Sequence, residues 1–175
     1  AIGCERCHGP GELHVRKPEQ VGDEPPNIVN PVSLEPPLRE AVCQQCHLQG
    51  DIRVVRAGRS LTDYRPGLPL FAIESVFVRA DKVGKTRFFG QVEQMHESRC
   101  FRESQGKMGC ISCHDPHQSN TEKQLTKETT SQLCFSCHEN NKTKRPFVHG
   151  PVAAGDCNIC HNPHSSPYPN LTEET

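Results

Sequence analysis

The sequence predicts a mostly irregular fold in which short α-helices and one small β-hairpin are joined by long stretches of coil. Only 33% of its 175 residues are apolar, the mean hydropathy is -0.67, and tryptophan is absent. A chain of this composition cannot bury a protein core of the usual size. Its 15 prolines and 13 glycines favour loops over long regular elements.

Ten of the eleven cysteines fall into one pattern, Cys-x-x-Cys-His, which occurs five times. The copies occupy residues 4–8, 43–47, 110–114, 134–138 and 157–161. This pattern is the attachment signature of c-type haem, because two thiols three positions apart can bond one porphyrin and the next residue lies beneath its iron. We therefore predict five covalently bound haem c groups that pack the core. The haem-free chain is expected to be mostly unfolded.

The pattern also predicts the individual haem-binding residues. The thiols that bond haem are those of Cys4, Cys7, Cys43, Cys46, Cys110, Cys113, Cys134, Cys137, Cys157 and Cys160. The proximal iron ligands are His8, His47, His114, His138 and His161. Five other histidines match the five distal iron positions and are predicted to fill them: His14, His96, His117, His149 and His164. Met95 and Met108 are the competing sulfur ligands, and which distal histidine serves which haem stays open.

Zinc sites and disulfide scaffolds are the alternatives for a cysteine-rich chain. Neither requires histidine directly after the second cysteine, and five such histidines by chance have a frequency on the order of 10⁻⁶. Cys100 is the one cysteine outside the pattern. It is expected to be a buried free thiol, with a redox-active or intersubunit thiol as the alternative.

Residues 1–50 are predicted to form a two-haem segment. Six prolines make residues 18–37 an extended surface segment. A helix is predicted to begin near Pro37, because proline suits the first helical turn, and to run into Cys43.

Residues 51–109 carry no copy of the pattern. Runs of β-branched and aromatic residues predict two strands, Ile52–Arg56 and Ser75–Arg79, that pair as a hairpin. Apolar spacing in Gln91–Glu103 predicts a helix. This haem-free segment is expected to line haem edges, with a small cap or docking surface as the alternative.

Residues 110–175 are predicted to be a three-haem module with a doubled motif. Cys110–His117 recurs 47 residues later as Cys157–His164. Each copy contains a turn dipeptide, Asp115-Pro116 in the first and Asn162-Pro163 in the second. The turn aims the last histidine of each copy away from its own haem, so we expect that histidine to bind the iron of a neighbouring haem.

Charge and hydropathy limit the partners and the location. A net charge of -1 and a pI near 6.9 give no reason to expect nucleic acid binding. No apolar run approaches the 18 residues of a membrane span, and no leader is recognisable. Covalent haem attachment is typical of exported proteins, so a periplasmic or extracellular location is predicted. Ala1 is then expected to be a processed or truncated start.

Several stretches resemble known multihaem proteins. Gly3–His14 looks like the cytochrome module related to the tetrahaem cytochrome that accepts electrons from hydroxylamine oxidoreductase. Residues 42–50, 64–69, 93–100 and 109–117 resemble exported multihaem proteins that carry this module ahead of tetratricopeptide repeats, and Cys110–His164 looks like a doubled Cys-x-x-Cys-His module. The resemblance implies bis-histidine haems in stacked and perpendicular pairs, and electron transfer. The sequence shows no further haem segment before Gly3 and no repeats after Thr175, which predicts a fragment or a trimmed member.

Three functions compete at this point. Electron transfer between redox partner proteins is favoured, because irons with two histidine ligands have no open position for a substrate. The alternative is a multihaem reductase that acts on a small nitrogen oxyanion or hydroxylamine, which needs one open distal position. As a structural variant of the first, the chain is expected to be able to polymerise into an extracellular haem filament, or nanowire. Haems near the two ends, at Cys4 and at Cys157–His164, would meet those of neighbouring copies.

Overall fold

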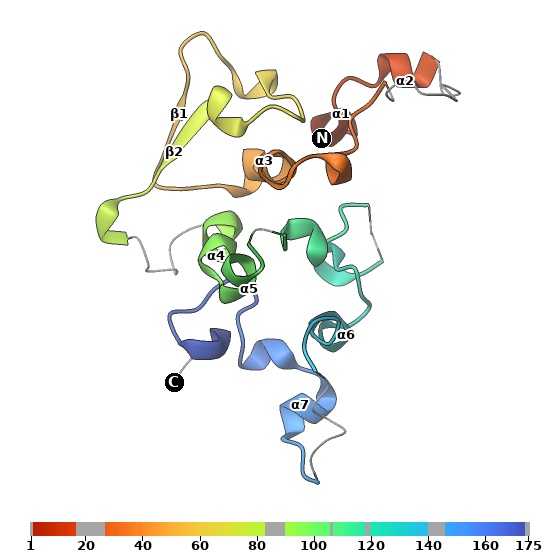
Figure 1. Ribbon diagram of the computed structural model, residues 1–175, viewed down its shortest axis with the longest axis vertical. Helices are drawn as coiled ribbons and strands as arrows, with labels where there is room; N and C mark the ends of the chain where they lie inside the picture. The colour runs from red at the N-terminus through yellow and green to blue at the C-terminus, as the bar shows by residue number, and fades with distance from the viewer. Residues whose placement is uncertain are drawn as a thin grey trace. The chain divides into compact units, whose positions relative to one another are not determined.

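The computed structural model describes residues 2–16, 27–82, 90–105, 107–117, 120–139 and 146–173 (Figure 1). Coil predominates in these ranges, the helices are short, and the described strands form one two-stranded antiparallel sheet. This agrees with the fold class predicted from the sequence. The chain divides into two compact units, Ala1–Asp81 and Lys82–Thr175, which are taken here one at a time.

The helices of the first unit are α1 (Glu5–His8), α2 (Glu12–Arg16) and α3 (Pro36–His47). Helix α3 confirms the helix predicted near Pro37. It begins on two prolines, which lack the N–H groups that a first turn leaves without partners. Residues 18–26 of the predicted extended segment lie outside the described residues. Further along the same segment, Pro31–Ser33 forms a 3₁₀ turn capped by the side chain of Asn30.

The predicted hairpin is present. Strand β1 (Ile52–Val55) pairs antiparallel with β2 (Glu74–Phe77), with Ile52 opposite Phe77. The chain reaches β1 through Gly50, whose φ is +56°. A Cβ atom at this position would lie 2.3 Å from a methyl group of Val76, so only glycine fits the approach to the second strand.

A charged pair fastens the hairpin to α3. Arg53 holds the carboxylate of Glu74 with two nitrogens, and the Glu74 side chain is only 1% exposed. Arg53 also donates to the carbonyl oxygen of Gln45 on α3 at 3.1 Å. A buried carboxylate is costly without such a partner. The hairpin therefore belongs to the unit of the first two motifs, whereas residues 82–109 of the predicted haem-free segment belong to the second unit.

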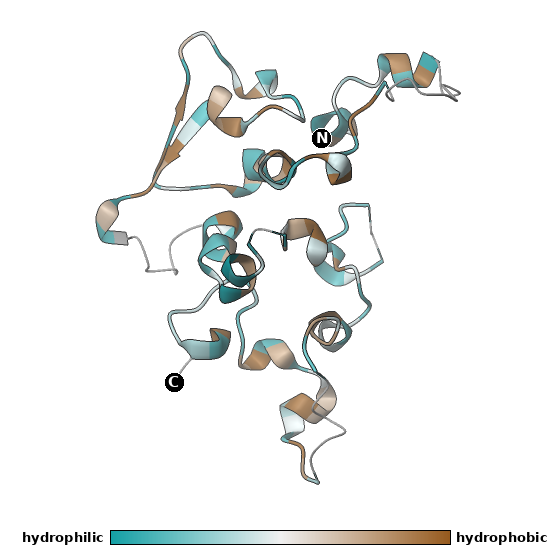
Figure 2. Cartoon of the chain, in the orientation of Figure 1, coloured by the Kyte–Doolittle hydropathy of each residue, from teal (hydrophilic) through white to brown (hydrophobic). Residues whose placement is uncertain are grey.

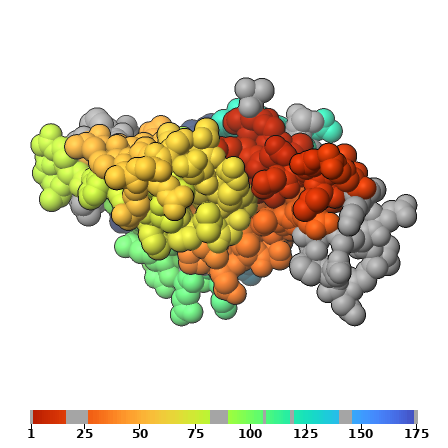
Figure 3. Space-filling model, turned by 90° about the horizontal axis from the view of Figure 1, so that it is seen from above, coloured from red at the N-terminus to blue at the C-terminus, as the bar shows by residue number. Residues whose placement is uncertain are grey.

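The first motif contacts the rest of the first unit through two hydrogen bonds. Arg6 donates to the carbonyl oxygen of Leu61 at 3.1 Å, and Gln45 donates to that of Arg6 at 3.2 Å. Figure 3 shows the N-terminal segment, in red, lying beside the segment around Leu61, in yellow. These contacts bring the turn that carries Cys4 and Cys7 close to the helix that carries the second motif.

The buried apolar core is small. In the described residues it consists of Ala41, Val42, Tyr64, Leu70, Ile73, Val92 and Met95. Twice as many large apolar side chains, fourteen, are exposed, among them Phe147 at 89% and Ile159 at 63%. In Figure 2 the apolar residues, in brown, are distributed over the short elements of both units. Protein side chains alone therefore bury little apolar surface, as the composition predicts.

The helices of the second unit are α4 (Gln91–Glu97), α5 (Arg99–Glu103), α6 (Thr130–Cys134) and α7 (Gly150–Ala154). The single helix predicted over Gln91–Glu103 is wrong in one respect, because Ser98 interrupts it. The Ser98 hydroxyl donates to the carbonyl oxygen of Met95 at 2.7 Å and accepts the N–H of Phe101 at 3.2 Å. It thus caps the start of α5, which a continuous helix would not need.

Each helix of the described ranges is too short or too polar to cross a bilayer.

Replacing the ten motif cysteines by alanine removes the predicted covalent attachment and should abolish cooperative thermal unfolding. The reason is that seven buried apolar side chains cannot offset the entropy of ordering the chain. Circular dichroism at rising temperature measures the transition, with the haem-loaded protein as control. A cooperative transition of the alanine variant at the same temperature would contradict this account.

Candidate haem-attachment sites

The Cys-x-x-Cys-His segments all form tight turns, although of different kinds. The first coincides with α1, the second ends α3, and the fourth begins at the last residue of α6. The third and fifth begin as 3₁₀ turns, Cys110–Ser112 and Cys157–Ile159, instead of α-helices. In the segments outside α3, the histidine N–H donates to the carbonyl oxygen of the first cysteine, at 2.9 to 3.1 Å. This bond places both thiols and the imidazole on one turn.

Three proximal histidines are fixed by backbone carbonyl groups. The Nδ1 atoms of His8, His114 and His161 lie 2.8, 2.9 and 2.8 Å from the carbonyl oxygens of Val29, Lys123 and Asn170. A carbonyl oxygen only accepts, so Nδ1 must carry the proton and Nε2 keeps its lone pair. This is the tautomer that an iron-binding histidine needs, held by the outer contact that metal ligands usually have.

The carbonyl contacts belong to a structural repeat. His114 pairs with Leu125 in an antiparallel bridge, and His161 pairs with Thr172 in the same way. Lys123 and Asn170, 47 residues apart, both have positive φ angles, of 56° and 59°. Each starts a turn that brings a carbonyl oxygen back to a histidine ring.

Sequence reasoning missed these outer contacts. A backbone carbonyl can come from any residue type, and Lys123 and Asn170 do not look alike. The Leu-Thr pairs at 125–126 and 171–172 do look alike, but they are 46 residues apart. Aligning the two repeats on these pairs would therefore shift them by one residue from the 47-residue spacing of the motifs. The contacts could have been predicted by extending the 47-residue repeat of the motifs to the residues beyond His164.

The predicted turns after the third and fifth motifs are present. The Asp115 side chain accepts the N–H of His117 at 2.9 Å, and the Asn162 side chain accepts that of His164 at 3.0 Å. Asn162 also accepts the N–H of Ser165 at 3.3 Å. These short polar side chains hold the backbone as it leaves each motif.

The predicted distal histidines occupy different surroundings. His14 lies exposed on α2, His149 lies exposed before α7, and the ring of His117 is 77% exposed. His96, on α4, stacks against Phe101 with ring centroids 4.4 Å apart.

His164 is half-buried and faces a proximal histidine. Its ring centroid lies 6.3 Å from that of His114, and the two ring planes are within 2° of parallel. Burial, with a smaller effect of His114, lowers the pKa of His164. The ring is therefore neutral at neutral pH and can offer a lone pair to a metal.

In the first unit the attachment thiols lie beside one another. Burial raises the pKa of Cys7, and the neighbouring thiols of Cys43 and Cys46 add to the effect. Burial, with the thiols of Cys43 and Cys7, likewise raises the pKa of Tyr64 to about 12. The first and second motifs thus present their thiols to one shared region around a buried tyrosine.

In the second unit the three remaining motifs are linked in the same way. Burial and the adjacent thiol of Cys157 raise the pKa of Cys134 to about 11, and Cys113 contributes less. Burial raises the pKa of Cys113, with further effects of Cys137 and Cys100. Cys100 is half-buried on α5 beside the third motif. It therefore lies near an attachment thiol, although it belongs to no motif.

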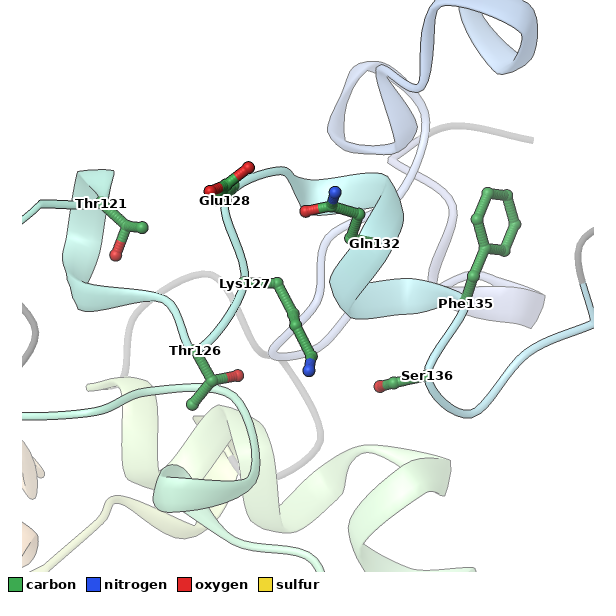
Figure 4. Close-up of a pocket in the computed structure, with 7 residues that line it drawn as sticks. All are labelled: Thr121, Thr126, Lys127, Glu128, Gln132, Phe135 and Ser136. Carbon is green, nitrogen blue, oxygen red and sulfur yellow. The ribbon is translucent and has the colours of Figure 1, made fainter.

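Two cavities flank the fourth and fifth motifs. One, of about 680 Å³, lies between the 3₁₀ turn Glu122–Gln124 and α6, and Figure 4 shows Lys127 extending between Thr126 and Ser136. The other, of about 550 Å³, is lined by Cys157 and by residues around the end of α7. Both hollows are largely open to solvent.

The residues present fit haem c. All eleven cysteines are free thiols, and within the described ranges no three Cys, His, Asp or Glu side chains are arranged to hold a metal ion by themselves. What each turn offers instead is two thiols and one imidazole, and in three turns that imidazole is fixed as the right tautomer. This donor set matches a porphyrin bonded at two points with its iron above the histidine.

Comparison with known proteins supports this assignment. The family model for the doubled CXXCH motif matches residues 104–143 and 149–175. The multiheme cytochrome MtrA of Shewanella baltica (strain OS185) is 30% identical over 161 residues, which are 86% of this chain and 46% of that protein. The chain thus spans about half the length of this curated relative.

The fold and the sites define a protein of the multihaem class, built on Cys-x-x-Cys-His turns that each offer two thiols and one imidazole. More particularly, the chain is a multihaem c-type cytochrome with a doubled CXXCH module in its second unit. The doubled module predicted from Cys110–His164 is thereby confirmed. The likeness of Gly3–His14 to the module linked to hydroxylamine oxidoreductase stays a prediction.

Replacing Asn162 by alanine should lower the free energy of unfolding of the haem-loaded protein by about 1 kcal/mol, because two backbone N–H groups lose their acceptor. Denaturant titration measures the loss. The matched control is Asn162→Asp, which keeps the acceptor and copies Asp115 of the first repeat, so it should lose less than half as much. An equal loss in both variants would show that this contact does not hold the turn.

Proposed function

We propose that the chain is a pentahaem electron-transfer protein. Each of the ten motif cysteines bonds a haem, and each of the ten histidines serves as an iron ligand. The observation that carries the proposal is the repeated Cys-x-x-Cys-His turn, in which the Nδ1 atoms of His8, His114 and His161 are held by backbone carbonyl oxygens and the lone pair stays on Nε2. Besides burial, thiols of successive motifs raise one another's pKa, Cys43 that of Cys7 and Cys157 that of Cys134, which supports neighbouring haem sites.

The histidines set what the sites can do. Bound haem iron supplies one-electron chemistry, and two imidazole ligands leave it no position for a substrate. The Nδ1 contacts of His8, His114 and His161 support the proximal assignment, because a protonated Nδ1 leaves the lone pair on Nε2. The histidine count supports the distal one, with five side chains for five positions. The sites therefore favour electron transfer over reduction of a small molecule.

The surface supports haem contact as well. Apolar side chains such as Val15, Val152 and Ile159 are exposed near the motifs and can pack against porphyrin edges. Because haem is attached covalently to exported chains, the proposed location is the periplasm or the extracellular space. The proposed partners are redox proteins that exchange electrons with exposed haem edges.

The oxidised protein should be wholly low-spin, and the reduced protein should bind carbon monoxide at less than about a tenth of its haems, because every iron has two histidine ligands. Absorption and electron paramagnetic resonance spectra measure both. Turnover of nitrite or hydroxylamine with a reduced dye, together with a high-spin haem, would favour the reductase instead.

Assembly into a haem filament remains a prediction from the sequence. Electron microscopy of the natively isolated protein tests it directly. Long filaments with a regular subunit repeat would establish a homopolymer with haem contacts between copies. Discrete particles at all concentrations would exclude the filament and leave a carrier or a module of a larger protein.

A further inference from the structure

The pair formed by His114 and His164 has the geometry of two ligands on one metal. Their ring centroids are 6.3 Å apart and the planes are within 2° of parallel. Two imidazole nitrogens bound at about 2 Å on opposite sides of one metal bring the ring centroids to about 6 Å. Parallel rings at this centroid distance are compatible with one iron between them.

Offset stacking of two rings can give a similar centroid distance. The hydrogen bond of His114 fixes the tautomer that shared metal binding needs. Its Nδ1 is held by the carbonyl oxygen of Lys123 at 2.9 Å, so its metal-binding nitrogen is the one not occupied by the backbone. His164 is held by Asn162 in a turn that ends its own motif, and its ring lies with the third motif instead of the fifth.

We propose that His114 and His164 bind the same iron, that of the haem attached through Cys110 and Cys113, with parallel imidazole planes. This inference rests on the bis-histidine function proposed above and assigns one of its pairs. Coordination then links the fifth motif to the third, across 50 residues of chain. The first copy of the repeat cannot make the equivalent pair, since residue 67, fifty positions before His117, is glycine.

The test is a double-mutant cycle in the haem-loaded protein. Either His114→Ala or His164→Ala alone should free a coordination position on one haem of five, read as high-spin signal and carbon monoxide binding. Because both residues serve one iron, the double variant should still affect only one haem. The matched control is His161→Ala with His164→Ala, which removes ligands only three residues apart but from two irons, and should affect two haems.

Mass spectrometry counts the attached haems in every variant. If His114→Ala prevents attachment at Cys110 and Cys113, adding His164→Ala should create no new high-spin haem, so the proposal stays testable. Two affected haems in the His114–His164 double variant, or no effect of His164→Ala, would overturn the pairing. High-spin haem in the unaltered protein would instead overturn the bis-histidine function itself.

The parallel planes provide a second readout. Parallel imidazoles give a rhombic low-spin electron paramagnetic resonance signal, whereas crossed planes give a strongly anisotropic one. One rhombic component should therefore disappear in His164→Ala. A spectrum in which His164→Ala removes only a strongly anisotropic component would contradict the parallel arrangement.

Discussion

The proposed attachment of haem to the Cys-x-x-Cys-His turns is the constraint on which the rest of this structural account depends. The chain offers seven buried apolar side chains in the described residues and exposes twice as many large ones. Short helices without a protein core are marginal in water. Covalent bonds at the turns, as proposed, would fix large apolar rings beside these segments and supply the surface on which they pack. Each α-helix of the described residues carries or adjoins a cysteine or a histidine, whereas the β-hairpin carries neither.

Many polar contacts of the protein lie at the same Cys-x-x-Cys-His turns. Backbone carbonyl groups orient His8, His114 and His161, and the side chains of Asp115 and Asn162 hold the turns that follow two of the motifs. The outer contacts of the two repeats occur at equivalent positions 47 residues apart, although Lys123 and Asn170 differ. A backbone carbonyl group can make this contact whatever the side chain.

Much of the organisation could be predicted from the sequence because it depends on residue type. The Cys-x-x-Cys-His spacing predicted the doubled module, Pro37 predicted the start of α3, and β-branched runs predicted the hairpin. The break at Ser98 could not be predicted, because serine is tolerated inside helices. Only the structure shows that the Ser98 side chain caps the start of a second helix, α5. The carbonyl contacts and the meeting of His114 with His164 depend on the path of the chain, which residue types do not specify.

The most direct test of this account is the mass of the natively isolated protein, followed by mapping of the haem-bearing peptides. The account predicts a mass increase of five haem groups, one on each Cys-x-x-Cys-His turn, with Cys100 unmodified. Fewer than five haems on the native protein, or haem bonded to Cys100, would contradict the claim that haem at every turn forms the core.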